Sequence, residues 1–267
     1  MTAPSRKPAA ALHATVLGSS CAIPRPARAC SSYLLEGEGI RIILDFGTGA
    51  FANAQRYVRP EDIDAIVISH MHADHFLDLI PLRYALKYGP RANDWRVPLY
   101  LPPGGEPILR AISDALSREP GGDFIGEVFE VHTYDPARRL RIGPAQLRFA
   151  HARHYIPAFA CRCELAGASF VYSADTAPAD AVVRLAREAD LFLCEATLLE
   201  DHRESATGRG HASAREAASM AREAGVRRLS ITHYPNEATP EAITEHVRAV
   251  FAGELDVADD HATYAIE

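Results

Sequence analysis

Four residues of types that bind transition metals lie within six consecutive positions. His70 and His72 are two apart, and Asp74 and His75 are adjacent. An apolar run precedes them and an apolar segment follows, so a polar surface turn that is rich in histidine by chance does not explain the cluster. Imidazole nitrogen and carboxylate oxygen are ligands that zinc accepts, and a catalytic site keeps a coordination position open for water. The pattern predicts a catalytic metal site in a loop at the end of a strand.

The elements around this loop alternate between predicted strands and predicted helices. Apolar runs and alternations predict strands at 13–18, 32–36, 40–44, 63–69, 97–101, 169–173, 191–195 and 228–231, with further strands between 128 and 164. Helical spacing predicts helices at 51–57, 76–87, 106–116, 178–188, 212–224 and 240–251. Two strand-rich halves, each with helices and each ending strands in metal-binding residue types, indicate the α/β class. We expect two mixed sheets packed face to face with helices outside, a four-layer αββα sandwich.

Length and composition are those of an ordinary globular protein. The chain has 267 residues, of which 48% are hydrophobic and 24% charged. We expect a flexible N-terminus over residues 1–10 and one domain over 11–267. No apolar run is long enough for a signal peptide core or a membrane span, which predicts a cytoplasmic location without membrane contact.

Cysteine content and net charge restrict the possible chemistry further. Five cysteines without a Cys-x-x-Cys pair favour reduced thiols, and we expect Cys161 and Cys163 to be small buried residues of one strand rather than metal ligands. The formal charge of −7 argues against broad binding to nucleic acid, which depends on neutralising many phosphates. The negative net charge is still compatible with a small phosphate substrate or a short RNA.

The run from Ser69 to His75 resembles the His-x-His-x-Asp-His signature of metallo-β-lactamase-fold hydrolases. The likeness is greatest to the ribonuclease Z and bacterial phosphodiesterase branch of that superfamily, and it covers nearly the whole chain. The similar segments are 15–20, 45–49, 173–176 and 210–213 continuing through 231–233.

The resemblance implies two divalent metal ions, expected to be Zn²⁺, with Mn²⁺ or Fe²⁺ as alternatives. The seven implied ligands are His70, His72 and His154 for one ion, Asp74, His75 and His233 for the other, and Asp175 as a bridge between them. His151 lies three residues before His154 and is the alternative to it. The spacing from His154 to Arg162 is similar to that of the family and favours His154.

Two adjacent cations would lower the pKa of a shared water, so that a metal-bridging hydroxide attacks phosphorus at neutral pH. Asp74 would orient this nucleophile. The resemblance implies that His211 contacts the scissile phosphate or protonates the leaving oxygen, whereas a helix N-cap or surface role is the alternative. Asp45 is a candidate for fixing the tautomer of a ligand histidine, and a turn-capping role is equally compatible with its position.

The length of one segment bears on the substrate. Ribonuclease Z has a long arm for transfer RNA between the ligand-histidine strand and the bridging aspartate, but only residues 164–174 lie between Arg162 and Asp175 in this chain. The absence of room for an arm favours a small phosphodiester, such as a cyclic nucleotide, a nucleotide-derived cyclic phosphate or a short oligonucleotide. Arg28, Arg153 and Arg162 are candidates for phosphate contact.

Other functions remain as alternatives. These are a ribonuclease Z-like tRNA 3′-processing endonuclease, a hydrolase of lactones, thioesters or sulfate esters, a di-iron redox protein, and a non-catalytic scaffold. The Gly-His-Ala-Ser context of His211 favours phosphodiesters over other esters. A redox member would need a flavin partner or an extra domain, and a scaffold would tend to lose ligands, whereas all seven positions are filled here. The resemblance also suggests a homodimer.

Overall fold

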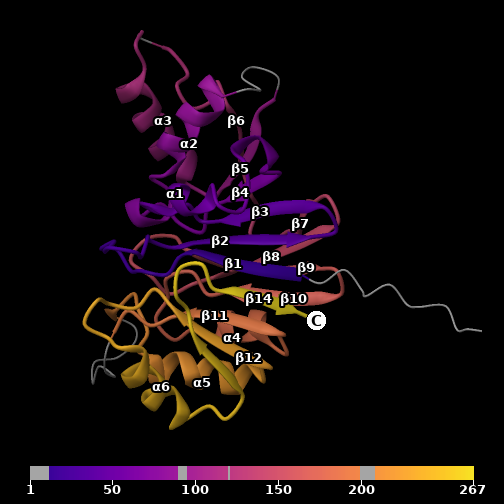
Figure 1. The fold of residues 1–267 in the computed structure, drawn as a ribbon, viewed down its shortest axis with the longest axis vertical. Coiled ribbons are helices and arrows are strands. Elements are labelled where there is room, and N and C mark those ends of the chain that lie inside the picture. The colour runs from indigo at the N-terminus through magenta and orange to yellow at the C-terminus, as the bar shows by residue number, and fades with distance from the viewer. Residues whose placement is uncertain (1–11, 90–94, 120, 199–207) are drawn as a thin grey trace, which may run out of the picture.

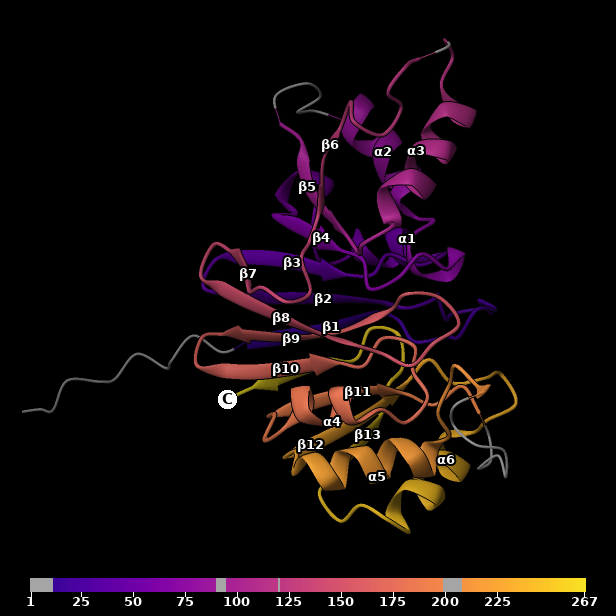
Figure 2. The same cartoon turned by 180° about the vertical axis from the view of Figure 1, so that it is seen from behind.

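Two seven-stranded sheets lie face to face in the computed structural model, which describes residues 12–89, 95–119, 121–198 and 208–267. The first sheet has the order β14-β1-β2-β3-β4-β5-β6 and the second the order β13-β12-β11-β10-β9-β8-β7. Helices α1–α3 lie at one end of the molecule and α4–α6 at the opposite end, with the sheets between them (Figures 1 and 2). The predicted four-layer αββα sandwich of the α/β class is confirmed.

The strands of the first sheet are β1 (Leu12–Gly18), β2 (Ser32–Gly37), β3 (Ile40–Leu44), β4 (Ala65–Val67), β5 (Val97–Leu101), β6 (Phe129–Thr133) and β14 (Thr263–Ile266). Those of the second sheet are β7 (Leu140–Ile142), β8 (Ala145–His151), β9 (Phe159–Leu165), β10 (Ala168–Tyr172), β11 (Leu191–Glu195), β12 (Arg228–Thr232) and β13 (Glu254–Val257). The helices are α1 (Ala50–Ala54), α2 (Leu79–Tyr88), α3 (Gly105–Leu116), α4 (Asp180–Ala186), α5 (Ala214–Ala224) and α6 (Pro240–Arg248). Short 3₁₀ turns cover Pro60–Asp62 and Ala73–His75.

Burial along the strands explains the layers. In β8 the buried residues Ala145, Leu147 and Phe149 alternate with partly exposed ones, so this strand buries one face only. All five residues of β10 are buried, because one face packs between the sheets and the other lies beneath helices. Phe170 belongs to the cluster between the sheets, whereas Val171 belongs to the cluster under α4, α5 and α6.

Both sheets combine an antiparallel half with a parallel half. Strands β3 to β6 are parallel in the first sheet, and β10 to β13 are parallel in the second. Carboxyl ends of parallel strands meet at one edge of a sheet, and connections there are where ligand-binding loops of α/β proteins lie. The candidate ligands follow several of these strand ends.

The C-terminal part of the chain departs from the prediction. Strands β13 and β14 were not predicted, and β14 pairs antiparallel with β1 in the register Leu12↔Ile266. The two sheets therefore do not coincide with the two halves of the sequence. The helix expected from residue 76 begins at Leu79, because Ala73–His75 forms a 3₁₀ turn.

Other expectations can be compared directly. Cys161 and Cys163 are buried in the cluster between the sheets, and all five cysteines are free. The expected flexible N-terminus, 1–10, lies outside the described residues. Among the helices that the structure describes, none has the length and apolar character needed to cross a membrane.

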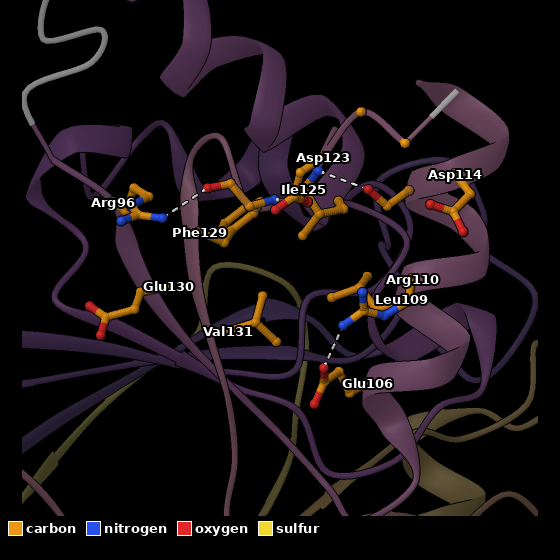
Figure 3. A pocket seen from close by; sticks show the side chains of 14 residues that line it. Arg96, Glu106, Leu109, Arg110, Asp114, Asp123, Ile125, Phe129, Glu130 and Val131 are labelled. Atoms are coloured by element: carbon orange, nitrogen blue, oxygen red, sulfur yellow. Dashed lines mark hydrogen bonds and ion pairs between the residues drawn. The ribbon is translucent and has the colours of Figure 1, made fainter. Parts of the chain in front are cut away.

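A pocket of about 500 Å³ lies between α3 and β6 (Figure 3). Its lining mixes apolar side chains such as Leu109 and Phe129 with the charged side chains of Arg96, Arg110 and Glu130. None of the candidate metal ligands lines it, so the chemistry has to be looked for elsewhere.

Gly47, which follows β3, lies against the backbone of the loop that contains Asp74. A Cβ on Gly47 would lie 1.9 Å from the backbone oxygen of Asp74 and 2.8 Å from the Cβ of Cys30. We expect Gly47→Ala to lower the free energy of unfolding by about 2 kcal/mol or more, because overpacking of backbone cannot relax by a rotamer change. Urea denaturation measures this loss. Gly208→Ala is the control, since nothing lies within 4 Å of its added Cβ, and an equal effect of both substitutions would contradict the steric explanation.

Candidate metal centre

All seven residues predicted to bind metal come together in two groups that share Asp175. The first group is His70, His72, His154 and Asp175, and the second is Asp74, His75, Asp175 and His233. Within each group the ligand atoms lie within 4.8 Å of one another. The side chains come from the loop after β4, the β8–β9 connection and the segments that follow β10 and β12. The structure therefore contains His/Asp clusters that are compatible with a binuclear metal site.

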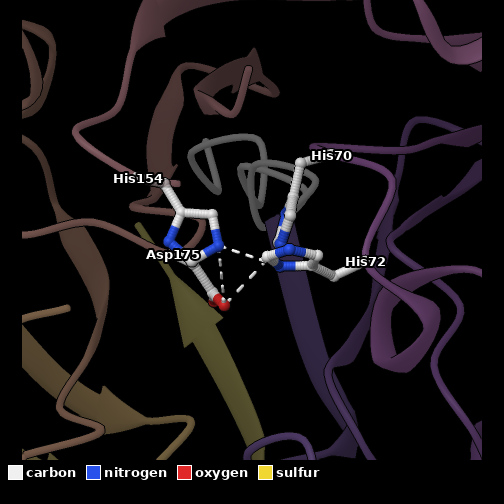
Figure 4. A group of neighbouring side chains, drawn as sticks. All are labelled: His70, His72, His154 and Asp175. Atoms are coloured by element: carbon white, nitrogen blue, oxygen red, sulfur yellow. Dashed lines mark hydrogen bonds and ion pairs between the residues drawn. The ribbon is translucent and has the colours of Figure 1, made fainter. Parts of the chain in front are cut away.

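The first group brings three imidazoles around one carboxylate (Figure 4). The Nε2 atom of His154 is 2.9 Å from Nδ1 of His72. The Oδ2 atom of Asp175 is 3.7 Å from Nε2 of His70 and 3.9 Å from Nε2 of His154. These atoms point toward a common centre, as ligands of one ion would.

The second group lies on the other side of Asp175. The Nε2 atom of His75 is 3.3 Å from Oδ2 of Asp74 and 3.4 Å from Oδ2 of Asp175. The Nε2 atom of His233 is 3.4 Å from Oδ2 of Asp74 and 3.5 Å from Oδ1 of Asp175. Oδ2 of Asp175 thus lies near imidazoles of both groups, and Oδ1 lies near His233 of the second, so one carboxylate is shared between the two groups.

Asp45 makes hydrogen bonds to the loop that carries the candidate ligands. Its Oδ2 atom accepts a hydrogen bond from Nδ1 of His75 at 2.7 Å, so the Nε2 atom of this ring is left for the centre. The same carboxylate accepts bonds from the backbone N–H and the hydroxyl of Ser69 and from the hydroxyl of Tyr172. The hydroxyl of Ser69 also lies 3.0 Å from Nδ1 of His70. Asp45 therefore makes the contact that would fix the tautomer of a ligand histidine.

Two further imidazoles are oriented in the same manner. Nδ1 of His154 donates to the backbone oxygen of Gly210 at 2.7 Å, and Nδ1 of His233 lies 2.8 Å from the hydroxyl of Thr197. In both rings Nε2 faces the centre. His72 is the exception, because it is its Nδ1 atom that faces the centre.

Several atoms at the centre lack a protein partner. Among the described residues, Nε2 of His70, Nε2 of His75 and Oδ1 of Asp175 are buried and accept or donate no hydrogen bond. A buried polar atom without a partner is costly unless something else satisfies it. Imidazole lone pairs and a carboxylate oxygen in one place are the donor set of a divalent transition metal. The residues present therefore fit a pair of such cations.

The charges around the centre affect the protonation of its carboxylates and imidazoles. Burial would raise the pKa of Asp175, but the surrounding imidazoles, His233 and His75 foremost, hold it well below its usual range. Burial lowers the pKa of His70. Burial would also lower the pKa of His75, but the charges of Asp175 and Asp45 outweigh it and raise this pKa. The lowered pKa of Asp175 favours its ionised form, and the raised pKa of His75 favours a proton on that imidazole. A divalent cation between them would provide the same compensation of the buried negative charge.

His211 lies beside the centre and is paired with a buried glutamate. Its Nδ1 atom is 2.9 Å from Oε1 of Glu195, and its ring is 4.9 Å from that of His154 and stacks on that of His233 at 5.9 Å. Burial would lower the pKa of His211, but the hydrogen bond and the charge of Glu195 raise it. This imidazole is therefore held in one orientation and is able to carry a proton next to the candidate metal centre.

Glu195 was not predicted as a site residue. It is fully buried and accepts bonds from the backbone N–H groups of Thr176 and Thr197 and from the hydroxyl of Thr197. Glu195 ends β11 just as Asp175 follows β10, so a strand that runs into an acidic residue was the signal available in the sequence.

The remaining candidates belong to neither of the two groups. His151 is exposed at the end of β8 and its ring contacts Phe159. Arg28 pairs with Asp259 at 2.9 Å and lies over the ring of Tyr234. The guanidinium of Arg28 is therefore used in contacts with Tyr234 and Asp259, close to His233.

The other two arginines differ from each other. Arg162 donates to the backbone oxygens of Leu185 and Arg187, at the end of α4, and pairs with Glu164. Through these bonds Arg162 ties β9 to the end of α4. Arg153 is exposed.

Comparison with known proteins places the chain in a family. The model of the beta-lactamase superfamily domain matches residues 40–234. The chain is 28% identical to the probable metallo-hydrolase YhfI of Bacillus subtilis, over 91% of this chain and 96% of that protein. It is 29% identical to ribonuclease Z of Haloferax volcanii, over 93% of each chain.

Solved structures show the same architecture. The crystal structure of YhfI superposes with a TM-score of 0.84 at 24% identity, covering 96% of this chain and 99% of that one. A diphosphatase of the PhnP family superposes with a TM-score of 0.73 at 21% identity, covering 96% and 100%. The chain therefore belongs to the beta-lactamase superfamily, among its metallo-β-lactamase-fold hydrolases.

Proposed function

We propose that this protein is a two-metal phosphodiesterase that hydrolyses a small phosphodiester, such as a cyclic nucleotide or a short oligonucleotide. The observation that carries the proposal is the His211–Glu195 pair at 2.9 Å, adjacent to two His/Asp groups that share Asp175. Hydrolysis of a phosphodiester needs charge neutralisation on the phosphoryl oxygens and a proton for the leaving oxygen. The two features meet these two needs.

We propose that the first group holds one divalent ion and the second group the other, with Asp175 in contact with both. Zinc suits the nitrogen-rich donor set, and Mn²⁺ or Fe²⁺ is the alternative. When bound, the pair would supply an activated water and Lewis-acid stabilisation of the phosphoryl oxygens.

The chain's own residues would then position and transfer protons. Asp74, whose side chain is 12% exposed, is able to accept a hydrogen bond from the attacking water and orient it toward phosphorus. Glu195 holds Nδ1 of His211, so that Nε2 of the same ring donates its proton to the leaving oxygen. One P–O bond forms to the water oxygen, which releases a proton to solvent, and the P–O bond to the leaving group breaks, with the proton from His211 completing the alcohol. His211 then regains a proton from solvent.

A small substrate is favoured over transfer RNA by the connection between β9 and β10. Only Ala166 and Gly167 separate these strands, and both have positive φ, as in a tight two-residue hairpin turn. The match to the Haloferax ribonuclease Z extends over 298 positions, more than the 267 residues of this chain, so that relative contains residues without counterparts here. Its name and that of the PhnP-family diphosphatase support phosphate chemistry for this chain.

Metal content is the first test. We expect the purified protein to contain about two divalent ions per chain by mass spectrometry, and Asp175→Asn to lose most of this metal because both groups share Asp175. Removal of metal by a chelator should abolish turnover and lower the melting temperature, since buried ligand atoms then lose their partner. Adding Zn²⁺ or Mn²⁺ should restore both. A chelated protein with unchanged melting temperature and activity would contradict the metal site.

Replacement of His211 separates catalysis from metal binding. We expect His211→Ala to lower kcat by about 10²- to 10⁴-fold, the usual effect of losing an acid–base group, with two metal ions retained. Glu195→Gln should lower kcat by a smaller factor, because it weakens the orientation of His211 without removing the ring. Steady-state kinetics with metal analysis of the same preparations provide the measurement.

The matched control is His151→Ala, which removes an exposed histidine of the neighbouring strand end. It should leave both kcat and metal content within about two-fold of those of the unchanged protein. Loss of metal in His211→Ala would instead mean that His211 is a ligand.

The substrate class is tested by a panel on the metal-loaded protein. It contains bis-p-nitrophenyl phosphate, cyclic nucleotides, precursor transfer RNA, lactones and thioesters. We expect the highest kcat/KM for the small phosphodiesters, because His211 lies beside the centre and no long arm interrupts the β9–β10 hairpin. Fast lactone or thioester hydrolysis beside slow phosphodiester turnover would replace this proposal with the other ester class, and preferential cleavage of precursor transfer RNA would replace it with the endonuclease.

A further inference from the structure

Tyr155 is an exposed aromatic residue at the edge of the candidate centre. It directly follows His154, and 64% of its surface is exposed. Its ring lies 5.1 Å from the ring of His154 and 5.8 Å from that of His211. Among the exposed large apolar residues that the structure describes, it is the one whose ring contacts imidazoles of the centre.

The ring is held in place from one side. A Cβ on Gly210 would lie 2.7 Å from a ring carbon of Tyr155 and 2.8 Å from Nδ1 of His154. The absence of a side chain at Gly210 therefore lets the tyrosine pack against the backbone there. The carbonyl of Gly210 also accepts the hydrogen bond from His154, so the same backbone segment positions the imidazole and the aromatic ring.

Packing of this kind distinguishes Tyr155 from an ordinary surface tyrosine. Tyr88, at the end of α2, is 75% exposed, and its ring contacts side chains of its own helix, Tyr84 and Arg83. Tyr155 instead contacts the imidazole of the preceding residue, His154, and packs against Gly210 and His211 of a segment distant in the sequence, while most of its surface stays open to solvent. An open aromatic ring that is fixed beside a reaction centre is suited to stacking on a planar group of the substrate.

Resting on the phosphodiesterase function proposed above, we propose that Tyr155 is a specificity residue that stacks on the nucleobase of a nucleotide substrate. In a nucleoside cyclic phosphate only one ribose separates the base from the phosphate. When His211 faces the leaving oxygen of that phosphate, the base is therefore close enough to reach the ring of Tyr155, which contacts His211. Base–aromatic stacking tolerates different bases, because every base has a π-face. The inferred substrate class is therefore nucleotides in general, in preference to sugar phosphodiesters that lack a base.

The test compares two cyclic phosphodiesters that differ only in the base. The metal-loaded protein is assayed with 3′,5′-cyclic AMP and with the 3′,5′-cyclic phosphate of methyl β-ribofuranoside. We expect Tyr155→Leu to raise KM for cyclic AMP by about ten-fold or more, the range of a lost stacking contact. Its KM for the base-free compound should change less than two-fold. Tyr155→Phe, which keeps the ring, should retain the KM of the unchanged protein for cyclic AMP.

Two further measurements make the outcome decisive. Tyr88→Leu is the matched control, because it removes an equally exposed tyrosine that lies on α2. Calorimetric titration with AMP and with ribose 5-phosphate gives a readout that does not need turnover. We expect Tyr155→Leu to weaken AMP binding about ten-fold while the affinity for ribose 5-phosphate is unchanged.

The results separate this inference from the function on which it rests. If the protein hydrolyses both cyclic phosphates with equal kcat/KM, and Tyr155→Leu alters neither, the phosphodiesterase function stands and the stacking role is wrong. If Tyr155→Leu raises KM equally for both compounds or loses metal, the residue supports the centre rather than the base. If no phosphodiester is hydrolysed, the proposed function fails, and the titrations with AMP and ribose 5-phosphate alone decide whether Tyr155 recognises a base.

Discussion

Buried negative charge among imidazoles is the constraint on which the rest of this structure depends. Asp175 is 2% exposed, and its Oδ1 atom has no hydrogen bond from any described residue. The Nε2 atoms of His70 and His75, in the same place, also make no hydrogen bond among the described residues. Such groups are tolerated in a folded protein when a cation completes them, because an unpaired buried charge is expensive. The ends of strands from both sheets therefore have to be held at one point. The hydrogen bonds around the centre hold them there.

The bonds behind the centre show how two sheets are fixed to one point. Asp45 follows β3 in the first sheet, yet it accepts a hydrogen bond from Tyr172 of β10 in the second. The same carboxylate orients His75 and ties down the backbone of Ser69. A shift of one sheet against the other would break the bond from Tyr172 and so remove one support of the carboxylate that orients His75. The core clusters supply the bulk of the stability, whereas Asp45 couples that packing to the geometry of the site.

The extent to which the sequence predicts the site follows from distance along the chain. The ligands from His70 to His75 lie within one loop, so their density is visible without a structure. Asp175 and His233 were found because they end apolar strands and because of the resemblance to a family. Glu195 was missed, since its partner is 16 residues away and its role arises only when β11 and the start of α5 meet. Likewise β13 and β14 are short edge strands with few buried residues, and their pairing is set by the sheets that they join.

The segment that precedes α5 contacts a candidate ligand and contains the candidate acid. Gly210 restrains His154 through its carbonyl, the next residue is His211 with its bond to Glu195, and Ser213 then begins α5 with a reciprocal capping box. A capped helix start fixes the direction of the chain that enters it, so the bonds of Gly210 and Glu195 determine where His154 and His211 lie relative to each other. The candidate acid is thus placed beside a candidate ligand by the protein's own contacts. Such prior positioning suits the small phosphodiester proposed above, because a substrate that enters a preformed site needs no large contact surface elsewhere.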